Sequence, residues 1–118
     1  IGGLGKGGRS YYAIDVTDPA TMTTETAAAG RVLWEFTAPE MGYSFGEPMV
    51  VKTRQYGWTV IIPSGYNTPD GRGYLFFVNP RNGELLQTVT TGVGSTTSDA
   101  GLAHANAYVL DFTDGYAD

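Results

Sequence analysis

The sequence contains no cysteine, which excludes a disulfide framework and a thiolate zinc site. Charged residues make up only 16% of the chain, and its seven lysines and arginines are scattered. With a formal net charge of −5, the chain has no basic patch that could neutralise a row of phosphates, so nucleic-acid binding is excluded. The longest apolar runs, Thr59–Pro63 and Tyr74–Val78, are too short to span a membrane.

The residues that are present favour a turn-rich β protein. The 118 residues suffice for one domain, and 42% are hydrophobic, including eight tyrosines that can fill a core. About one residue in five is glycine or proline, too many for a helical bundle. Five glycines fall among the first eight residues, and we interpret the chain as an excerpt from a longer protein.

Short segments rich in aromatic and β-branched residues recur along the chain and predict strands. In one of them Val32, Trp34 and Phe36 point one way and Leu33 and Glu35 the other, as in a strand. We expect Ala20–Gly30 to be an insertion loop, with a helical turn at Ala27–Ala29 as the alternative. The expected strands cover residues 11–16, 31–37, 48–53, 58–63, 74–79, 84–90 and 107–112.

A weak internal repeat indicates the architecture. Tyr11–Asp15 is echoed by Leu75–Asn79, and both segments end in Asp or Asn directly before a turn. Gly46–Val51 is echoed by His104–Val109. The repeating unit is four short antiparallel strands, which is the blade of a β-propeller. The sequence therefore predicts an all-β fold, a fragment of a β-propeller with about two blades of four-stranded antiparallel sheet.

The repeat also predicts how the blades divide the chain, which forms a single all-β unit over residues 1–118. Residues 1–45 supply the outer strands of one blade, 46–92 form a complete blade, and 93–118 start the next blade. The first and last strands of such an excerpt lack neighbours. We expect them to associate with a second copy, or residues 107–112 to pair within the chain.

Several collinear motifs resemble the C-terminal propeller of the PilC/PilY family of type IV pilus biogenesis and tip adhesin proteins, which has quinoprotein-like blade repeats. They cover nearly the whole chain: Gly7–Pro19, Leu33–Thr37, Met41–Pro48, Ser64–Asn67, Thr91–Ser95 and Gly101–Ala103. The resemblance implies a non-enzymatic module that supports pilus extension and adhesion. Its implied partners are pilus proteins or a host or surface receptor.

The resemblance further implies a bacterial location that is pilus-associated, at the outer membrane or cell surface, or periplasmic. Two alternative functions use similar blades: a quinoprotein-like oxidoreductase and an outer-membrane assembly scaffold. The absence of cysteine pairs gives no support to quinone chemistry. Residues flanking this segment in its parent protein would separate these interpretations.

The last residues contain a candidate calcium loop. Calcium loops place oxygen ligands at alternate positions, with a glycine at the sharp turn. Two of the expected ligand positions fall on Leu110 and Phe112, which cannot ligate through their side chains, so the loop is one residue shorter than the family's. A plain turn closing a hairpin is the alternative. The candidate ligands are Asp111, Asp114, Tyr116 and Asp118.

Other conspicuous side chains favour structural roles. Asp15 precedes a turn as an Asx-type residue, and His104, the single histidine, opens a predicted strand without a nucleophile or orienting acid nearby in sequence. Trp34 and Trp58 have the chemistry to stack on a quinone or a glycan. The alternation around Trp34 instead predicts core packing between blades, whereas Trp58, at a hairpin exit, is left open.

Overall fold

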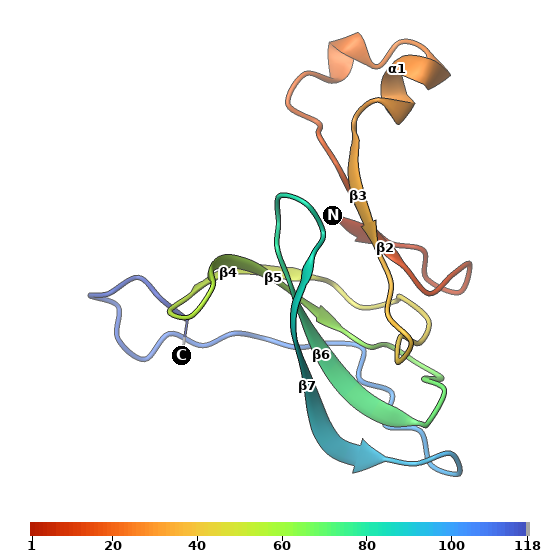
Figure 1. Ribbon diagram of the computed structural model, residues 1–118, viewed down its shortest axis with the longest axis vertical. Coiled ribbons are helices and arrows are strands. Elements are labelled where there is room, and N and C mark those ends of the chain that lie inside the picture. The colour runs from red at the N-terminus through yellow and green to blue at the C-terminus, as the bar shows by residue number, and fades with distance from the viewer. Residues whose placement is uncertain (118) are drawn as a thin grey trace.

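The computed structural model describes residues 1–117 and contains two antiparallel sheets, so the all-β prediction is confirmed (Figure 1). The first sheet has three strands in the order β1-β2-β3, and the second has four strands in the order β4-β5-β6-β7. The strands are β1 (Gly2–Gly3), β2 (Tyr11–Ile14), β3 (Val32–Phe36), β4 (Met49–Thr53), β5 (Gly57–Pro63), β6 (Arg72–Val78) and β7 (Leu85–Gly94).

Strands β4 to β7 form an up-and-down meander, as expected for one blade. The turns of its first and last hairpins each contain a glycine in the left-handed region, Gly57 at φ 70° and Gly83 at φ 73°. The register pairs Val60 with Val78 and Ile62 with Phe76, which places these four side chains on one face. Strand β1 was not predicted, because its two glycines carry no apolar pattern.

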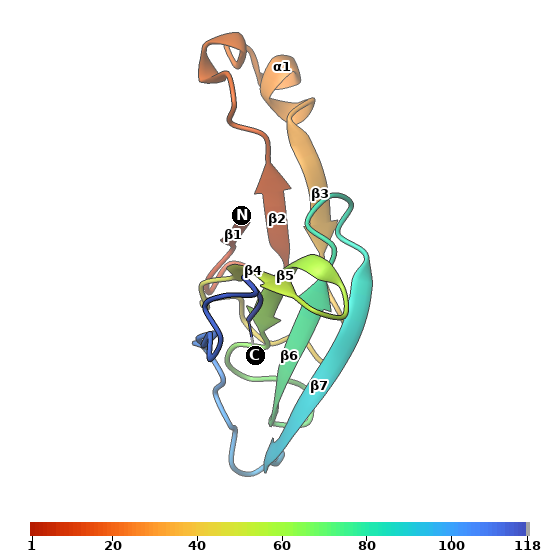
Figure 2. The ribbon, with the colours of Figure 1, turned by 90° about the vertical axis from the view of Figure 1, so that its left-hand side faces the viewer.

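An insertion separates β2 from β3 and extends away from both sheets (Figure 2). It contains a single 3₁₀ turn, Pro19–Thr21, and the short helix α1, Glu25–Ala29, neither of which buries a residue. Thr24 caps α1 because its side-chain oxygen accepts the Ala27 N–H at 3.2 Å. An insertion was expected here, and the Ala-rich stretch forms a helix slightly longer than the predicted turn.

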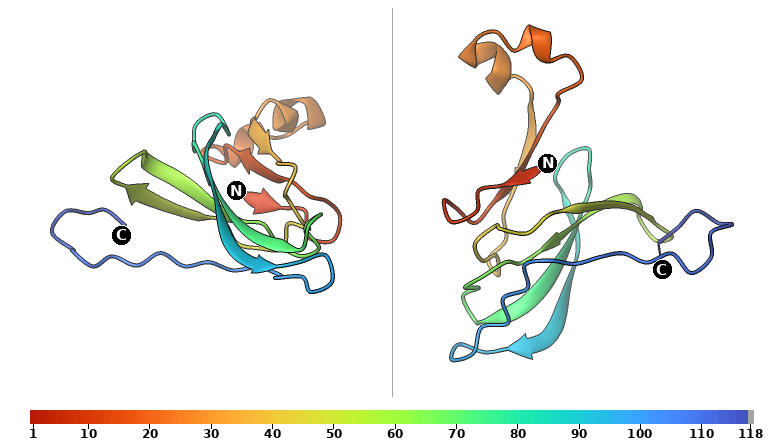
Figure 3. Two further views of the ribbon diagram at one scale, coloured as in Figure 1. Left: turned by 60° about the horizontal axis from the view of Figure 1, so that its bottom comes forward. Right: turned by 180° about the vertical axis from the view of Figure 1, so that it is seen from behind.

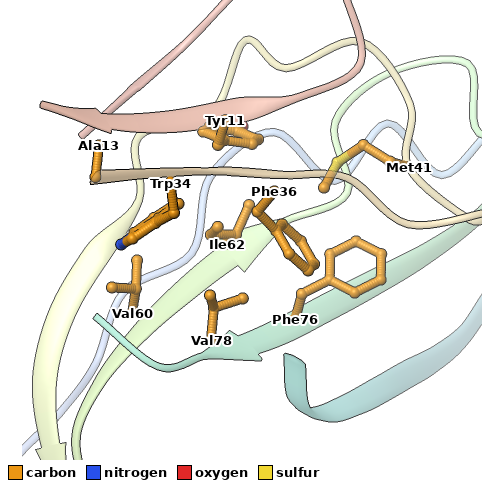
Figure 4. Packing of buried hydrophobic residues seen from close by; sticks show 9 residues of the cluster. All are labelled: Tyr11, Ala13, Trp34, Phe36, Met41, Val60, Ile62, Phe76 and Val78. Atoms are coloured by element: carbon orange, nitrogen blue, oxygen red, sulfur yellow. The ribbon is translucent and has the colours of Figure 1, made fainter. Parts of the chain in front are cut away.

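The hydrophobic core lies between the two sheets (Figure 4). Trp34 of β3 is only 6% exposed, as predicted, and its indole Nε1–H donates to the Pro80 carbonyl at 2.9 Å. This bond joins the first sheet to the β6–β7 turn of the second. The cluster consists of Tyr11, Ala13, Trp34, Phe36, Met41, Val60, Ile62, Phe76 and Val78.

Glycine-containing loops between the sheets pass close enough to each other to form backbone–backbone hydrogen bonds. The Tyr43 N–H donates to the Tyr66 carbonyl at 2.7 Å, and the Gly65 N–H donates to the Leu102 carbonyl at 2.8 Å. At Gly65, φ is +77° and a Cβ would lie 1.9 Å from the Tyr43 carbonyl oxygen, so only glycine fits. These loops carry three of the motifs on which the family resemblance rests, namely 41–48, 64–67 and 101–103.

The prediction of a strand at 107–112 is wrong, because the chain from 103 to 111 is extended but forms no strand (Figure 3). Residues 105–107 instead run past the second face of the four-stranded sheet, around an apolar hollow that includes Ile61 and Phe77. Thr53 of β4 forms an isolated parallel bridge with Ala117, and the Ala117 N–H donates to the Lys52 carbonyl at 2.8 Å. Residues 107–112 therefore do not pair as a strand within the chain.

Candidate functional site

The residues proposed as a calcium loop lie beside the β4–β5 hairpin. Asp111 accepts the Thr113 N–H at 2.9 Å and the Thr113 hydroxyl at 2.6 Å through one carboxylate oxygen. Asp114 accepts the Tyr116 N–H at 2.9 Å. Both carboxylates thus close tight turns, and Thr113 holds the pKa of Asp111 below its ordinary value through its hydroxyl and its N–H. Asp118, the fourth candidate ligand, lies outside the described residues.

Two cations of the hairpin face this loop. The Arg54 guanidinium forms an ion pair with the Asp114 carboxylate and lies 5.6 Å from the centre of the Tyr116 ring. The Lys52 ammonium lies 4.6 Å from the same ring centre. The positive charges next to Asp114 and Tyr116 are therefore supplied by Arg54 and Lys52.

The carboxylate of Asp114 already has a cation beside it. Within residues 1–117, no three acidic or histidine side chains come together as a metal-binding group. A cation at Asp114 would also have to displace Arg54, which already neutralises that carboxylate. Calcium binding by Asp111, Asp114, Tyr116 and Asp118 stays a prediction.

Among the described residues, six acidic or amide side chains close turns in the same way, by accepting the backbone N–H two residues further on. The Asx-type turn expected at Asp15 is confirmed, and hydrogen bonds from Thr17 hold the pKa of this carboxyl below its ordinary value. The six acceptors are Asp15, Asp70, Asn79, Asn82, Asp111 and Asp114. These side chains shape the loops, and the echo between Asp15 and Asn79 that indicated the repeat is visible in their geometry.

His104 does not open a strand, contrary to the sequence-based prediction. It is exposed on the extended segment that follows the buried Ala103. It borders a hollow of about 480 Å³ together with Glu47 and Asn106. The hollow lies where this segment passes the start of β4, and none of the described hydrogen bonds involves the imidazole as donor or acceptor.

The two tryptophans have opposite environments. Trp34 is buried in the core, whereas Trp58 is 62% exposed at the beginning of β5. Trp58 borders a pocket of about 380 Å³ whose other lining residues are Tyr56, Asn79, Pro80, Arg81 and Leu86. The sequence leaves the role of Trp58 open and gives no link between Trp58 and the β6–β7 turn. The register that pairs Val60 with Val78, continued by two residues, places position 58 opposite position 80, and this register is known only from the structure.

No helix within the described residues is both long and apolar enough to cross a membrane. The architecture defines the chain as a β-propeller fragment, with one four-stranded sheet and part of a second sheet packed against its face. No protein-family model matches the chain.

Comparison with individual proteins identifies the kind of propeller. The chain is 38% identical over 98% of its length to a type IV pilus biogenesis factor PilY1 homolog of Xylella fastidiosa, and 32% identical over its whole length to PilY1 of Pseudomonas aeruginosa. Its fold matches the crystal structure of the Pseudomonas aeruginosa PilY1 C-terminal domain with a TM-score of 0.79, at 29% identity over 98% of the chain.

The resemblance to the C-terminal propeller of the PilC/PilY family is thereby confirmed, and the chain is related to PilY1 along its whole length. It spans 8% of the Xylella relative, 10% of the Pseudomonas relative and 22% of the chain in the solved structure.

Proposed function

We propose that this chain is a non-enzymatic propeller module of a type IV pilus biogenesis factor that supports pilus extension and adhesion. The observation that carries this proposal is the collinear similarity to PilY1 proteins over 98% to 100% of the chain, at 30% to 38% identity for the relatives that match this fully. The module would act in the periplasm or at the outer membrane and cell surface of a bacterium. Pilus proteins, or a host or surface receptor, would be its partners.

The sheets suggest how this module is organised. Strands β1 to β3 would belong to one blade, β4 to β7 would form the next, and the segment after Gly94 would begin a third. Packing of Trp34 and Phe36 against Val60, Val78 and Phe76 supports this division, because propeller blades bury their sheet faces against their neighbours. Each blade would then support the next, and the loops would be held rigidly at the rim.

The chemistry of the polar residues supports a scaffold rather than an oxidoreductase. The carboxylates of Asp15, Asp70 and Asp111 accept hydrogen bonds that close their own turns. The buried Ser44 hydroxyl accepts the Leu4 N–H at 2.9 Å, which fixes a loop crossing. These groups are used to hold the backbone. We expect no turnover and no saturable absorbance change when a quinone is titrated into the chain.

A chimera tests the pilus role directly. The corresponding segment of Pseudomonas aeruginosa PilY1 is replaced by this chain, and surface pili and twitching motility are measured in a strain lacking its own PilY1. We expect pili to be restored. A matched chimera carrying Gly65→Val, which cannot form the loop crossing, should restore few or none. A folded, exported chimera that yields no pili would contradict the proposal.

Calcium binding is tested separately by titration calorimetry. If the loop binds calcium, the unmodified chain should release or absorb heat in proportion to the ion added, and Asp111→Asn together with Asp114→Asn should abolish the signal. Arg54→Gln removes the competing cation and should strengthen binding. Absence of heat for the chain and for Arg54→Gln would exclude this loop as a calcium site.

A further inference from the structure

The pocket beside Trp58 combines an exposed aromatic face with hydrogen-bond donors on a fixed turn. Its volume of about 380 Å³ lies within the range of about 300–1,000 Å³ that is typical of small-molecule sites. Trp58 contributes a large side chain that is 62% exposed, although Val60, two residues along the same strand, is fully buried. A solvent-facing indole with polar groups beside it offers an apolar face on which a ligand ring can stack.

The turn that forms the opposite wall is held in place on several sides. The Asn79 N–H donates to the Glu84 carbonyl at 2.8 Å, and the Arg81 N–H donates to the Asn79 side-chain oxygen at 2.9 Å. Trp34 fixes the Pro80 carbonyl from the core side. A wall that is already ordered loses little conformational entropy when a ligand binds.

The polar groups of this pocket favour an anion. Arg81 is exposed and makes no ion pair among the described residues, in contrast to Arg31 and Arg54, which pair with Asp15 and Asp114. The Lys52 ammonium, across the strand pair from Trp58, is directed to Tyr116. The indole is therefore not covered by the neighbouring cation, and the guanidinium is available to a carboxylate.

We propose that this pocket, defined by Tyr56, Trp58, Asn79 and Arg81, binds an acidic saccharide. The apolar face of a pyranose ring would stack on the Trp58 indole, the sugar carboxylate would pair with Arg81, and the side-chain amide of Asn79 would donate to a hydroxyl. This inference rests on the proposed function, since it gives an adhesive module a ligand class.

A peptide fits the same surface less well. The lining residues come from the β4–β5 turn, the beginning of β5, the β6–β7 turn and the start of β7, and β5 is an inner strand between β4 and β6. A peptide strand would need a continuous free edge to extend a sheet, which this compact pocket does not offer. Stacking on one aromatic ring with polar groups around it is the arrangement that suits a single sugar residue.

The experiment follows the two indole N–H signals of the intact chain by NMR while sialyllactose is added, with lactose as the neutral probe. We expect the Trp58 signal to shift in a saturable way and the Trp34 signal, buried and bonded to Pro80, to stay in place. Lactose should bind about tenfold more weakly, because it lacks the carboxylate that Arg81 would pair with.

Variants separate the two contacts. Trp58→Ala should abolish binding measured by calorimetry, and Arg81→Gln should reduce sialyllactose affinity about tenfold, to that of lactose. Lys6→Gln, which removes the same charge from the exposed turn near the N-terminus, should bind like the unmodified chain. Equal affinity for the two sugars, no shift at Trp58, or a response only to an acidic aromatic peptide would overturn the proposal. None of these outcomes depends on pilus assembly, which the chimera tests.

Discussion

The four-stranded sheet and the segment from Ala103 to Phe112 have similar apolar alternation but different structures. In the sheet, four side chains are fully buried, each with 0% exposure: Val60, Ile62, Phe76 and Val78. In the segment, the alternate residues Tyr108, Leu110 and Phe112 are 68%, 73% and 82% exposed. Alternation therefore marks a face that is able to be buried, and a second sheet packed against that face decides whether it is.

The largest effect should come from the side chain that joins the two sheets. Trp34→Ala removes a buried indole and leaves the Pro80 carbonyl without its donor, so we expect a loss of about 3–5 kcal/mol in the free energy of unfolding. Urea denaturation followed by far-UV circular dichroism measures it. Trp58→Ala is the control and should stay within about 0.5 kcal/mol, because Trp58 is exposed. A loss below about 1 kcal/mol at Trp34 would contradict its core role.

The next effect in size should come from removing the buried hydroxyl of Tyr11, which belongs to the same core. Its phenol donates to the Gly46 carbonyl at 3.1 Å, so Tyr11→Phe should cost about 1 kcal/mol. Burial raises the pKa of Tyr11 from 10.0 to about 12, so the folded state holds this proton more tightly than the unfolded state does. The resulting stabilisation is complete below pH 10.0 and is lost as the pH rises to about 12.

The pH dependence has its own control. In thermal unfolding scans between neutral pH and pH 12, the unmodified chain should lose more stability than Tyr11→Phe does, because the variant has no phenol to ionise at this site. Tyr12→Phe, on the less buried side of the same strand, should follow the unmodified chain. Identical alkaline profiles for Tyr11→Phe and the unmodified chain would show that the Tyr11 phenol is accessible to solvent.

A smaller effect is expected where the final residues meet the hairpin. Arg54→Ala removes the ion pair with Asp114 and one cation near the Tyr116 ring, so global stability should fall by at most about 1 kcal/mol. Local opening should be more sensitive, and the Ala117 amide, which donates to the Lys52 carbonyl, should exchange its hydrogen faster. Arg31→Ala, which breaks a distant ion pair with Asp15, should leave that amide unchanged.

The smallest effect on stability should come from the exposed residues Tyr108, Leu110 and Phe112. Phe112→Ser replaces a side chain that is 82% exposed, and the free energy of unfolding should change by less than about 0.5 kcal/mol. The same chemical change at Phe76, which is fully buried, should cost several times more. Equal losses at these positions, measured by urea denaturation, would mean that the segment is packed as tightly as the sheet.

The sequence carried enough local information to predict the sheet and its turns. Alternation at Trp34 predicted a buried face, an Asx turn was predicted at Asp15, and the echo of Asp15 by Asn79 predicted a turn after each. These features depend on residues close together in the chain, so pattern and turn chemistry are sufficient. The resemblance to the PilC/PilY family likewise rested on short motifs that follow one another along the chain.

Other features required the tertiary structure, because they depend on which distant segments meet. The extended form of 107–112, the Arg54 ion pair at Asp114 and the pocket between Trp58 and Arg81 each join parts of the chain far apart in sequence. Side-chain type predicts what a residue is able to do, whereas its partners decide what it does. By itself, the sequence determined an all-β propeller fragment of the PilC/PilY type. Only the packing of its loops and sheets decided that one tryptophan holds the core and the other faces solvent.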